Sequence, residues 1–543
     1  MVIVEAERCT GCQLCSRECP TGAAHIEGRV AVIGEACVDC NLCVRVCEQE
    51  AIRAAIAPDD ERVTCDRCPV QCKILEGFAG ACRRYVNVGG RLELDRVLLL
   101  SERPGPHSET MLEPVITGVG AGTTSPCFTP APYIVEESID GIDVVTVVSE
   151  VPLSYGSLKL KVDTNIFVGE EGARVKRDGR PIGHVETEQY GSKMLAVGGV
   201  NTFHGRYGST AARTISDVCS GKKVTLKVEG GPRLELKLGD APRIDGVVPE
   251  KMRVGCGSAT LGMFAPYLRD VADEAIVLDP DITGLLSEHL AGRALGLEWS
   301  GIVPVGTKST IGRYFGQAGT GLGGTNVTEA RAAVASIDMR VARRGMTLFV
   351  TDTAGETAAL FRLTAAGELE ELELTDAARR AVAVIKGNAQ QSRVSALLMA
   401  GVGGSARSGV TKFPIKLNEA VHSGDVRLTV GGAPVFLLPG GGITFVVDVE
   451  KVPSGAIGWV PTPGVLAPIE YTMTKETYAR IEGHLESLRS RRSVTEEREC
   501  QTIDSREPLR DGRNPSPVKI GRNESLQATS VLMSGQDEHR VTS

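Results

Sequence analysis

The chain has 543 residues, of which 42% are hydrophobic and 24% charged, with 63 glycines and a formal net charge of −8 at pH 7. This length is too great for one ordinary core and predicts about three or four domains, and the glycine content favours a loop-rich α/β architecture over a helical bundle. Because the charge creates no basic field, we expect neither nucleic acid nor an anionic membrane as a partner.

The N-terminus and the cysteine usage predict a cytoplasmic protein. The first residues, MVIVEAERCTGC, show no basic region followed by an apolar run, so we predict no signal peptide. No apolar run reaches the roughly 18 residues that a transmembrane helix needs. Twelve of the sixteen cysteines fall in the first 82 residues. This concentration is typical of metal or cluster ligands in a reducing compartment rather than of a disulfide scaffold.

Residues 1–57 contain one cysteine pattern twice, C-x2-C-x2-C-x3-C, followed by Pro20 in the first copy and by Glu48 in the second. Bacterial two-cluster ferredoxins have this pattern, and the fourth cysteine of each copy binds the other cluster. A zinc site needs only two close pairs of ligands. It therefore does not explain two cysteine triplets that are each followed by a fourth, more distant cysteine. We therefore predict two [4Fe-4S] clusters in a ferredoxin-like module. The first is assigned to Cys9, Cys12, Cys15 and Cys47, and the second to Cys37, Cys40, Cys43 and Cys19.

A second cysteine set occupies residues 58–95. Its four thiols lie within eighteen residues, and Gly77 and Gly80 allow the chain to fold back on itself. The set consists of Cys65, Cys68, Cys72 and Cys82. Four thiolates suit either a structural zinc ion or a third iron–sulfur cluster, and the spacing does not decide between them.

The remaining body predicts a glycine-rich mixed α/β or α+β architecture in two subdomains, a strand-rich one at 96–260 and a mixed α/β catalytic one at 261–488. Alternating or continuous apolar patterns predict strands at 142–148, 158–162, 223–228, 234–238 and 443–449. Helical patterns predict helices at 328–337, 376–387 and 475–488. Residues 489–543 are polar and lack periodicity, so we predict a disordered, non-catalytic tail.

Two segments of the body are candidate cofactor-binding loops. GTGLGGT satisfies G-x-G-x-x-G through Gly319, Gly321 and Gly324, but it follows a loop-like segment rather than a strand, which favours a simple flexible glycine loop near a ligand. A helix after the loop would still offer its N-terminus to an anion. In GCGSATLGMF, the Ser-Ala-Thr string distantly resembles motifs in which a threonine carries a phosphoester-linked flavin, which makes Thr260 a candidate anchor. Cys256 in the same loop is either a cluster ligand or, more commonly, a buried thiol.

Candidate proton donors and anion-binding groups also lie in the body. A histidine titrates near neutrality and can supply the proton that accompanies electron transfer, which points to His184, His204 or His289. Lys308 and Arg313 supply cations for an anionic planar substrate. The simpler alternatives are ordinary polar histidines and a solvated basic loop.

Eight segments in one order carry a family resemblance. They are SPCFTPAPYIVEES, PLSYGSLKLKVDT, RVGCGSATLGMF, ITGLLSEH, GRYFG, GTGLGGTN, GGGITFVVDV and VPTPGVLAPIE. With the cysteine module before them, the chain resembles the 6-hydroxynicotinate reductase family over roughly residues 1–485. The resemblance implies a ferredoxin-linked reduction of 6-hydroxynicotinate to 1,4,5,6-tetrahydro-6-oxonicotinate in nicotinate degradation, and it also implies a flavin.

The expected chemistry assigns roles to the candidate residues. Hydride enters at C4 of the 6-oxo tautomer, negative charge develops on the 6-oxygen, and C5 then takes a proton. Arg313 or Lys308 would hold the substrate carboxylate, and His289 or His184 would supply the proton. Two rival functions are a ferredoxin-dependent reductase of another N-heteroaromatic acid and an electron-transfer subunit of a larger complex. The long glycine-rich body favours a small-molecule pocket over the last of these. The sequence does not fix the oligomeric state.

Overall fold

The structure is a computed structural model that describes residues 2–55, 61–94, 113–122, 129–188, 191–306, 323–462 and 464–496. The chain divides into two compact units, each considered by itself. The first contains residues 1–66 and 71–95, and the second contains residues 67–70 and 96–509. Within the described ranges, no helix combines the length and apolar character needed to span a membrane.

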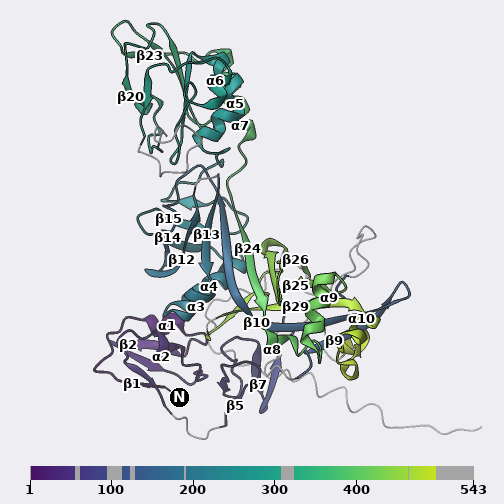
Figure 1. The fold of residues 1–543 in the computed structure, drawn as a ribbon. Coiled ribbons are helices and arrows are strands. Elements are labelled where there is room, and N and C mark those ends of the chain that lie inside the picture. The colour runs from purple at the N-terminus through teal and green to yellow at the C-terminus, as the bar shows by residue number, and fades with distance from the viewer. Residues whose placement is uncertain are drawn as a thin grey trace, which may run out of the picture. The chain divides into compact units, whose positions relative to one another are not determined.

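In the first unit, two short antiparallel strand pairs accompany two helices, each of which begins inside a cysteine triplet (Figure 1). The elements are β1 (Val2–Val4), α1 (Leu14–Glu18), β2 (Ala24–Glu27), β3 (Val30–Ile33), α2 (Leu42–Val46) and β4 (Ile52–Ala54). Val2, Ala24, Ala31 and Ile52 are buried in one small core together with Cys15. The sequence repeat therefore appears as two loop–helix–strand units that share this core.

The four-cysteine segment of the same unit folds into two further hairpins. Their strands are β5 (Val63–Thr64), β6 (Lys73–Ile74), β7 (Tyr85–Val88) and β8 (Arg91–Leu94). Buried Asn87 joins the hairpins, because its side-chain Nδ2 donates to the carbonyl of Ile74 at 2.8 Å and its backbone carbonyl accepts from the amide of Gly77 at 2.8 Å. Gly77 has φ +78°, so the chain reverses at a glycine as the sequence predicted.

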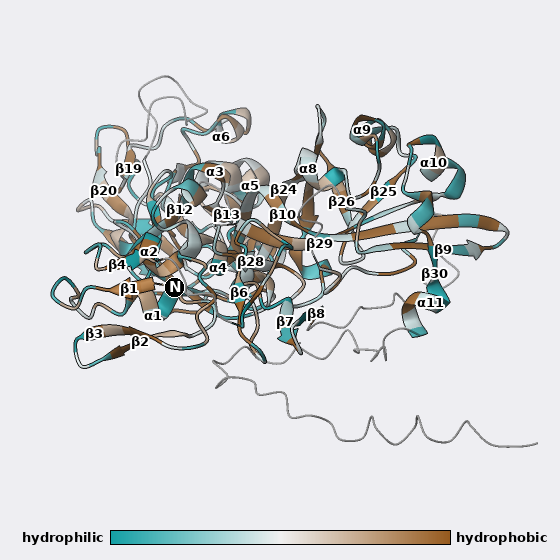
Figure 2. Ribbon diagram, turned by 90° about the horizontal axis from the view of Figure 1, so that it is seen from below, coloured by the Kyte–Doolittle hydropathy of each residue, from teal (hydrophilic) through white to brown (hydrophobic). Residues whose placement is uncertain are grey.

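The second unit is organised around β10 (Ile142–Asp163), a strand of 22 residues. Its first half pairs with β9 (Tyr133–Ile139) and β29 (Gly464–Thr474). Its second half pairs with β13 (Ser192–Gly198) and β24 (Arg393–Val402). In Figure 2 the central strands of this unit are largely in the brown of hydrophobic residues, in keeping with side chains such as Val147 and Leu160 that are fully buried.

A bulge between Ser154 and Ser157 interrupts the register of β10 where its partners change. Tyr155 in this bulge has φ +65°, a backbone conformation that is rare for a bulky residue. A bulge lets a strand bend while it stays continuous. The strands predicted at 142–148 and 158–162 are therefore two parts of one strand, because the bulge replaces the expected turn.

Further strands extend the large sheet on both sides of β10, in an order that is not sequential. They are β11 (Arg174–Arg177), β12 (Arg180–Thr187), β14 (Val224–Val228), β15 (Arg233–Leu236), β16 (Arg243–Ile244), β25 (Arg427–Val430), β26 (Ala433–Leu437), β27 (Ile443–Asp448) and β28 (Gly458–Val460). The strands predicted at 223–228, 234–238 and 443–449 are confirmed. Helices α3 (Val200–His204) and α4 (Gly208–Cys219) contact β13, and α4 also contacts β28 and β29.

The C-terminal elements of this unit correct two predictions. They are α8 (Gly404–Arg407), α9 (Pro414–Ser423), η2 (Val449–Lys451), α10 (Lys475–Arg480), η3 (Leu485–Ser487), β30 (Arg489–Ser490) and α11 (Arg491–Glu496). The helix predicted at 475–488 ends at Arg480, because Glu482 adopts φ +59° and the chain turns there. The disordered tail predicted from residue 489 is wrong for residues 489–496, because β30 pairs with β9 and Val494 is buried. Residues 497–543, with Cys500, lie outside the described part of the chain.

A subdomain whose described residues form a five-stranded sheet, a two-stranded sheet and three α-helices is inserted between β16 and β24. Its elements are α5 (Gly257–Val271), β17 (Glu274–Leu278), β18 (Gly284–Leu285), α6 (Leu290–Ala294), β19 (Ile302–Pro304), η1 (Ala330–Ala333), β20 (Val334–Ile337), β21 (Thr347–Asp352), β22 (Ala358–Leu363), β23 (Leu369–Leu372) and α7 (Asp376–Asn388). β17 and β21 are parallel neighbours, and α5 packs against α7 and β17. The helix predicted at 376–387 is confirmed. The helix predicted at 328–337 is wrong, because 334–337 pairs with β19 as a strand.

The insertion leaves and rejoins the large sheet through a two-stranded neck. Lys251 bridges Gln391, and the amide of Met252 donates to the carbonyl of Gln390 at 2.8 Å. The subdomain boundary predicted at residue 260 falls inside α5. The prediction failed because it assumed that the strand-rich part is contiguous in sequence, whereas β24 returns to the sheet beyond the insertion.

Candidate functional site

The two cysteine loops of the first unit have the same local backbone. Gly11 and Gln13 in the first loop have φ of 67° and 63°, and Asp39 and Asn41 at the equivalent places of the second both have φ of 56°. Left-handed residues therefore flank the middle cysteine of both triplets, where they turn the chain. The repeated spacing produces two loops with the same backbone pattern.

Electrostatic coupling identifies the thiols that surround Cys15. Burial raises the pKa of the Cys15 thiol to about 11, and the nearby Cys12, Cys9 and Cys47 oppose its ionisation further. Cys9, Cys12 and Cys15 belong to one triplet, whereas Cys47 is the last cysteine of the other copy of the pattern. Two of these sulfurs also accept hydrogen bonds from backbone amides, Cys9 from Ala31 and Cys47 from Ala51, both at 3.3 Å. Amide-to-sulfur hydrogen bonds are the contacts that stabilise thiolate ligands of iron–sulfur clusters.

The other four thiols line a small cavity in the same module. Its polar wall is formed by Cys19, Cys37, Cys40 and Cys43, and its apolar wall includes Val2, Ala24, Ile33 and Leu42. Burial, with a smaller effect of neighbouring cysteines that include Cys19, raises the pKa of Cys40 to about 11 and that of Cys43 to about 12. The cavity thus brings the fourth cysteine of the first copy to the triplet of the second.

The four-cysteine segment places its thiols in protected positions. Cys65, Cys68 and Cys72 are buried, and Cys82 is half-buried. The amide of Ala81 donates to Cys72 Sγ at 3.4 Å, and the amide of Cys65 donates to the carbonyl of Cys72 at 2.8 Å. Cys68 lies in the short stretch 67–70 that clusters with the second unit. Among the described residues, no group of three or more His, Cys, Asp or Glu side chains is spaced for a single metal ion.

In the second unit, polar groups gather at the carboxyl ends of the parallel strands β17 and β21. Asp279 and Asp281 follow β17, Asp352 ends β21, and Cys256 caps the N-terminus of α5 with its Sγ accepting from the amide of Ala259 at 3.4 Å. Open α/β sheets bind ligands at this edge. The arrangement forms because Gly257 at the start of α5 packs directly on the backbone of Ile282, where a Cβ would lie 2.3 Å from the carbonyl oxygen.

The candidate glycine loop is anchored at this edge. The amide of Thr325 donates to the carbonyl of Asp279 at 2.8 Å, and Gly324 packs so closely on Pro280 that no Cβ would fit. Gly306 lies against Gly323, so the two ends of the segment 307–322 are adjacent. Lys308, Arg313, Gly319 and Gly321 belong to that segment and lie outside the described residues.

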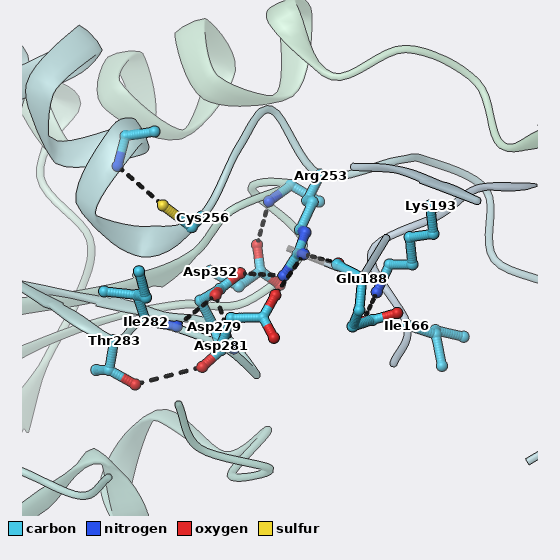
Figure 3. A network of polar contacts seen from close by, with 12 residues as sticks. Ile166, Glu188, Lys193, Arg253, Cys256, Asp279, Asp281, Ile282, Thr283 and Asp352 are labelled. Carbon is cyan, nitrogen blue, oxygen red and sulfur yellow. Dashed lines mark hydrogen bonds and ion pairs between the residues drawn. The ribbon is translucent and has the colours of Figure 1, made fainter. Parts of the chain in front are cut away.

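Arg253 connects this edge to the large sheet from a fully buried position (Figure 3). Its guanidinium donates to Asp279 at 2.7 Å and to Asp281 at 2.6 Å, and also to the backbone carbonyl of Glu188. Burial raises the pKa of Asp279, and the nearby Arg253 opposes that shift. A buried guanidinium needs such partners, because desolvation of an unpaired charge costs on the order of several kcal/mol.

A second buried ion pair continues the network. Lys193 Nζ donates to Glu188 Oε1, and both side chains are almost completely buried. Burial raises the pKa of Glu188 and lowers that of Lys193, while their mutual attraction opposes both shifts. The amide of Val168 donates to the other oxygen of Glu188 at 3.3 Å. The network therefore holds Glu188, which directly follows β12, Lys193 of β13 and titratable groups of the insertion in one desolvated place.

The predicted histidines lie apart from this edge. His289 caps α6, where its Nδ1 accepts from the amide of Ala291 at 3.1 Å and its ring lies on Gly262 of α5. It follows β18, which runs antiparallel to β17, so it lies toward the other end of the sheet. Burial lowers the pKa of His289. His184 is exposed on β12, and no contact among the described residues joins it to His289.

Thr260 gains no structural support as a flavin anchor. Its side chain is fully buried in α5, and its hydroxyl has no hydrogen-bond partner among the described residues. A phosphoester at this oxygen would require α5 to move away from its core, so the residues present do not fit a flavin attached there. The role of Thr260 stays a prediction.

Sequence reasoning missed the buried network of Arg253, Glu188, Lys193, Asp279 and Asp281. One signal was available: the run EAIVLDPD is a short apolar strand followed directly by two aspartates, which is the sequence of a carboxyl edge. The burial of Arg253, Glu188 and Lys193 has no such signal, because isolated charged residues in a sequence are usually exposed.

Comparison with known proteins agrees with this geometry. A family model described as a 4Fe-4S binding domain matches residues 2–25. The chain is 49% identical over 494 residues to the 6-hydroxynicotinate reductase of Eubacterium barkeri, a match that covers 90% of this chain and 99% of that protein. No solved structure matches. The resemblance found in the motifs is thereby confirmed, and the chain belongs to the 6-hydroxynicotinate reductase family.

Proposed function

We propose that this iron–sulfur oxidoreductase reduces the ring of 6-hydroxynicotinate to 1,4,5,6-tetrahydro-6-oxonicotinate with electrons from reduced ferredoxin. The observation that carries the proposal is the full-length relationship to the reductase of Eubacterium barkeri, together with the 4Fe-4S binding domain. The rival role of a bare electron-transfer subunit is not favoured, because the relationship includes the whole body and not only the cysteine module.

The cluster ligands follow from the grouping of the thiols. We propose that Cys9, Cys12, Cys15 and Cys47 hold one [4Fe-4S] cluster, and that Cys19, Cys37, Cys40 and Cys43 hold the other. Mutual electrostatic effects within the first set and the shared cavity of the second support this assignment. Such clusters carry one electron each at low potential. Of these eight thiols Cys15 is buried, and the hydrogen bonds from backbone amides to Cys9 and Cys47 support a ligand role for those two sulfurs.

The four-cysteine segment is proposed to hold one further centre, either zinc or a third iron–sulfur cluster. The buried thiols of Cys65, Cys68 and Cys72 and the amide-to-sulfur bond at Cys72 support a bound metal in general, since both kinds of centre use four thiolates. Metal analysis distinguishes the two: roughly eight irons with one zinc, or roughly twelve irons without zinc.

The stoichiometry of the reaction fits the proposed electron supply. Saturation of the C4–C5 bond consumes two electrons and two protons: C4 receives the hydride equivalent, and C5 receives a proton. Two reduced ferredoxins supply the two electrons one at a time, so both must be held before the ring is reduced. Two cluster sites in one module provide that capacity.

The substrate is proposed to bind at the carboxyl edge of β17 and β21. Lys308 and Arg313 belong to the segment whose two ends are anchored there, and one of them would bind the carboxylate as a charge-assisted partner. Of the two candidate proton donors, His184 is exposed, whereas His289 has a lowered pKa and an occupied Nδ1, which disfavour its cationic form. Because neither histidine lies at this edge, His289 and His184 stay alternative candidates for the donor of the C5 proton.

Product analysis tests this function. Protein purified without oxygen, supplied with reduced ferredoxin and 6-hydroxynicotinate, should release a product heavier by two hydrogens with saturated C4 and C5 in its NMR spectrum. Cys12→Ala should abolish this turnover. Reduction of another N-heteroaromatic acid, with 6-hydroxynicotinate left unchanged, would assign a different substrate to the protein. If His184→Ala and His289→Ala both keep their turnover, the C5 proton comes from solvent.

A further inference from the structure

Asp39 distinguishes the two otherwise equivalent cysteine loops. It lies between Cys37 and Cys40, and its Oδ1 lies 3.7 Å from Cys37 Sγ. Resting on the cluster assignment proposed above, we infer that Asp39 makes the centre held by Cys19, Cys37, Cys40 and Cys43 the lower-potential one of the two. A carboxylate this close to a half-buried ligand sulfur disfavours the additional negative charge of the reduced state, because like charges repel.

The internal repeat provides the comparison that isolates this side chain. The place of Asp39 is occupied by Gly11 in the first loop, and both residues have a left-handed backbone. At Gly11 a Cβ would lie 2.9 Å from the carbonyl oxygen of Arg29, so that loop admits no side chain. The second loop accommodates a side chain in a conformation that normally favours glycine, and the side chain is an acid placed against sulfur.

Backbone amides stabilise negative charge on sulfur in both groups, so they do not account for the difference. Cys9 and Cys47 accept hydrogen bonds from the amides of Ala31 and Ala51, and Cys37 and Cys40 accept from those of Asp39 and Leu42. On the side of the second group, the guanidinium of Arg62 donates to the carbonyl of Cys37 and partly offsets the acid. This guanidinium remains in any Asp39 variant, so a comparison of variants measures the carboxylate alone.

Unequal midpoint potentials would determine the order in which the two centres are reduced. The first electron from a one-electron donor would remain on the centre of Cys9, Cys12, Cys15 and Cys47, and the second would occupy the centre beside Asp39. The second electron is then the more strongly reducing of the pair. Ring reduction, which takes two electrons and two protons, would begin only when both centres are filled, so the once-reduced protein would not react with the substrate.

Potentiometric titration followed by electron paramagnetic resonance tests the inference on the full-length, cluster-loaded protein. The native protein should show two unequal midpoints, and Cys40→Ser should alter the signal of the lower one. Asp39→Asn, which keeps a residue that tolerates the left-handed backbone, should raise the lower midpoint and leave the higher one in place. Asp39→Gly should do the same, because it reproduces the first loop.

Glu35→Gln is the matched control, since Glu35 is an exposed acid in the same loop and its removal changes the net charge equally. It should leave both midpoints nearly unchanged. Equal midpoints in the native protein, or an Asp39→Asn shift no larger than that of the control, would overturn the inference. The proposed function fails differently, through a metal content below two clusters or through clusters that substrate does not reoxidise.

Discussion

At the scale of single residues, Lys193 illustrates how the buried network depends on complete pairing. Lys193→Met removes the cation but leaves the Glu188 carboxyl in a site without water, so we expect the variant to lose about 3–5 kcal/mol of stability, as when one partner of a buried pair is removed. The double variant Glu188→Leu/Lys193→Met should lose much less stability than Lys193→Met alone. Thermal and denaturant midpoints of the three proteins measure this coupling, and additive losses would contradict it.

His289 gives the stability a dependence on pH. Its pKa is lower in the folded protein than in the unfolded chain, so the unfolded chain binds more protons below the ordinary histidine value of about 6.5. The contribution of His289 is therefore fully present above that pH and decreases as the pH falls. His289→Asn keeps a cap acceptor for the amide of Ala291. As the pH falls from 8 to 5.5, the melting temperature of this variant should rise relative to that of the native protein. A difference that stays constant with pH would contradict this explanation.

At this scale the sequence provided specific candidates for the cluster ligands, which stay predictions, and it missed the buried charges. The cysteine pattern is informative because a cubane requires thiols at fixed spacing, so the two groups around Cys15 and Cys43 could be assigned in advance. The burial of Arg253 depends on contacts between segments far apart in the chain, which no local pattern encodes. The proposed contacts of Lys308 and Arg313 remain predictions.

At the scale of elements, the start of α5 is held by close backbone packing. A Cβ on Gly257 would lie 2.3 Å from the carbonyl oxygen of Ile282 and 2.7 Å from that of Val277, both backbone atoms with little freedom to move. Gly257→Ala should therefore lower the melting temperature by forcing α5 from β17, at a cost of about 1–3 kcal/mol or more.

Gly387 provides the control for this substitution. It lies in α7, where a Cβ added to it would have no atom within 4 Å, so Gly387→Ala should be neutral or stabilise the protein by about 0.5–1 kcal/mol through helix propensity. Equal destabilisation by both substitutions would show that packing at the α5 start is not the cause.

Element prediction succeeded where the periodicity was strong and local. The alternation of 223–228 and the capped amphipathic pattern of 376–387 correspond to β14 and α7. It failed at 328–337, where an alanine-rich segment pairs with β19, because tertiary pairing overrides a weak helix propensity. It also missed the continuity of β10, since a bulge with Tyr155 at positive φ has no reliable sequence signature.

At the scale of the whole molecule, the cysteine module and the body are separate compact units. The first unit is rich in thiols paired across an internal repeat, and the second contains the α/β insertion with its polar carboxyl edge. The mixed α/β body and an N-terminal 4Fe-4S binding domain could be predicted from the sequence. The domain boundaries could not, because the large sheet collects strands from both sides of an insertion, and chain order alone does not reveal such a return.

The most direct test of the proposed function is a single turnover without oxygen. The cluster-loaded protein is reduced with dithionite, freed from excess reductant, and mixed with 6-hydroxynicotinate while its visible and electron paramagnetic resonance spectra are recorded. We predict that the clusters reoxidise and that one tetrahydro-oxonicotinate forms for each pair of electrons lost. Clusters that remain reduced in the presence of 6-hydroxynicotinate would contradict the proposal that this chain reduces that ring.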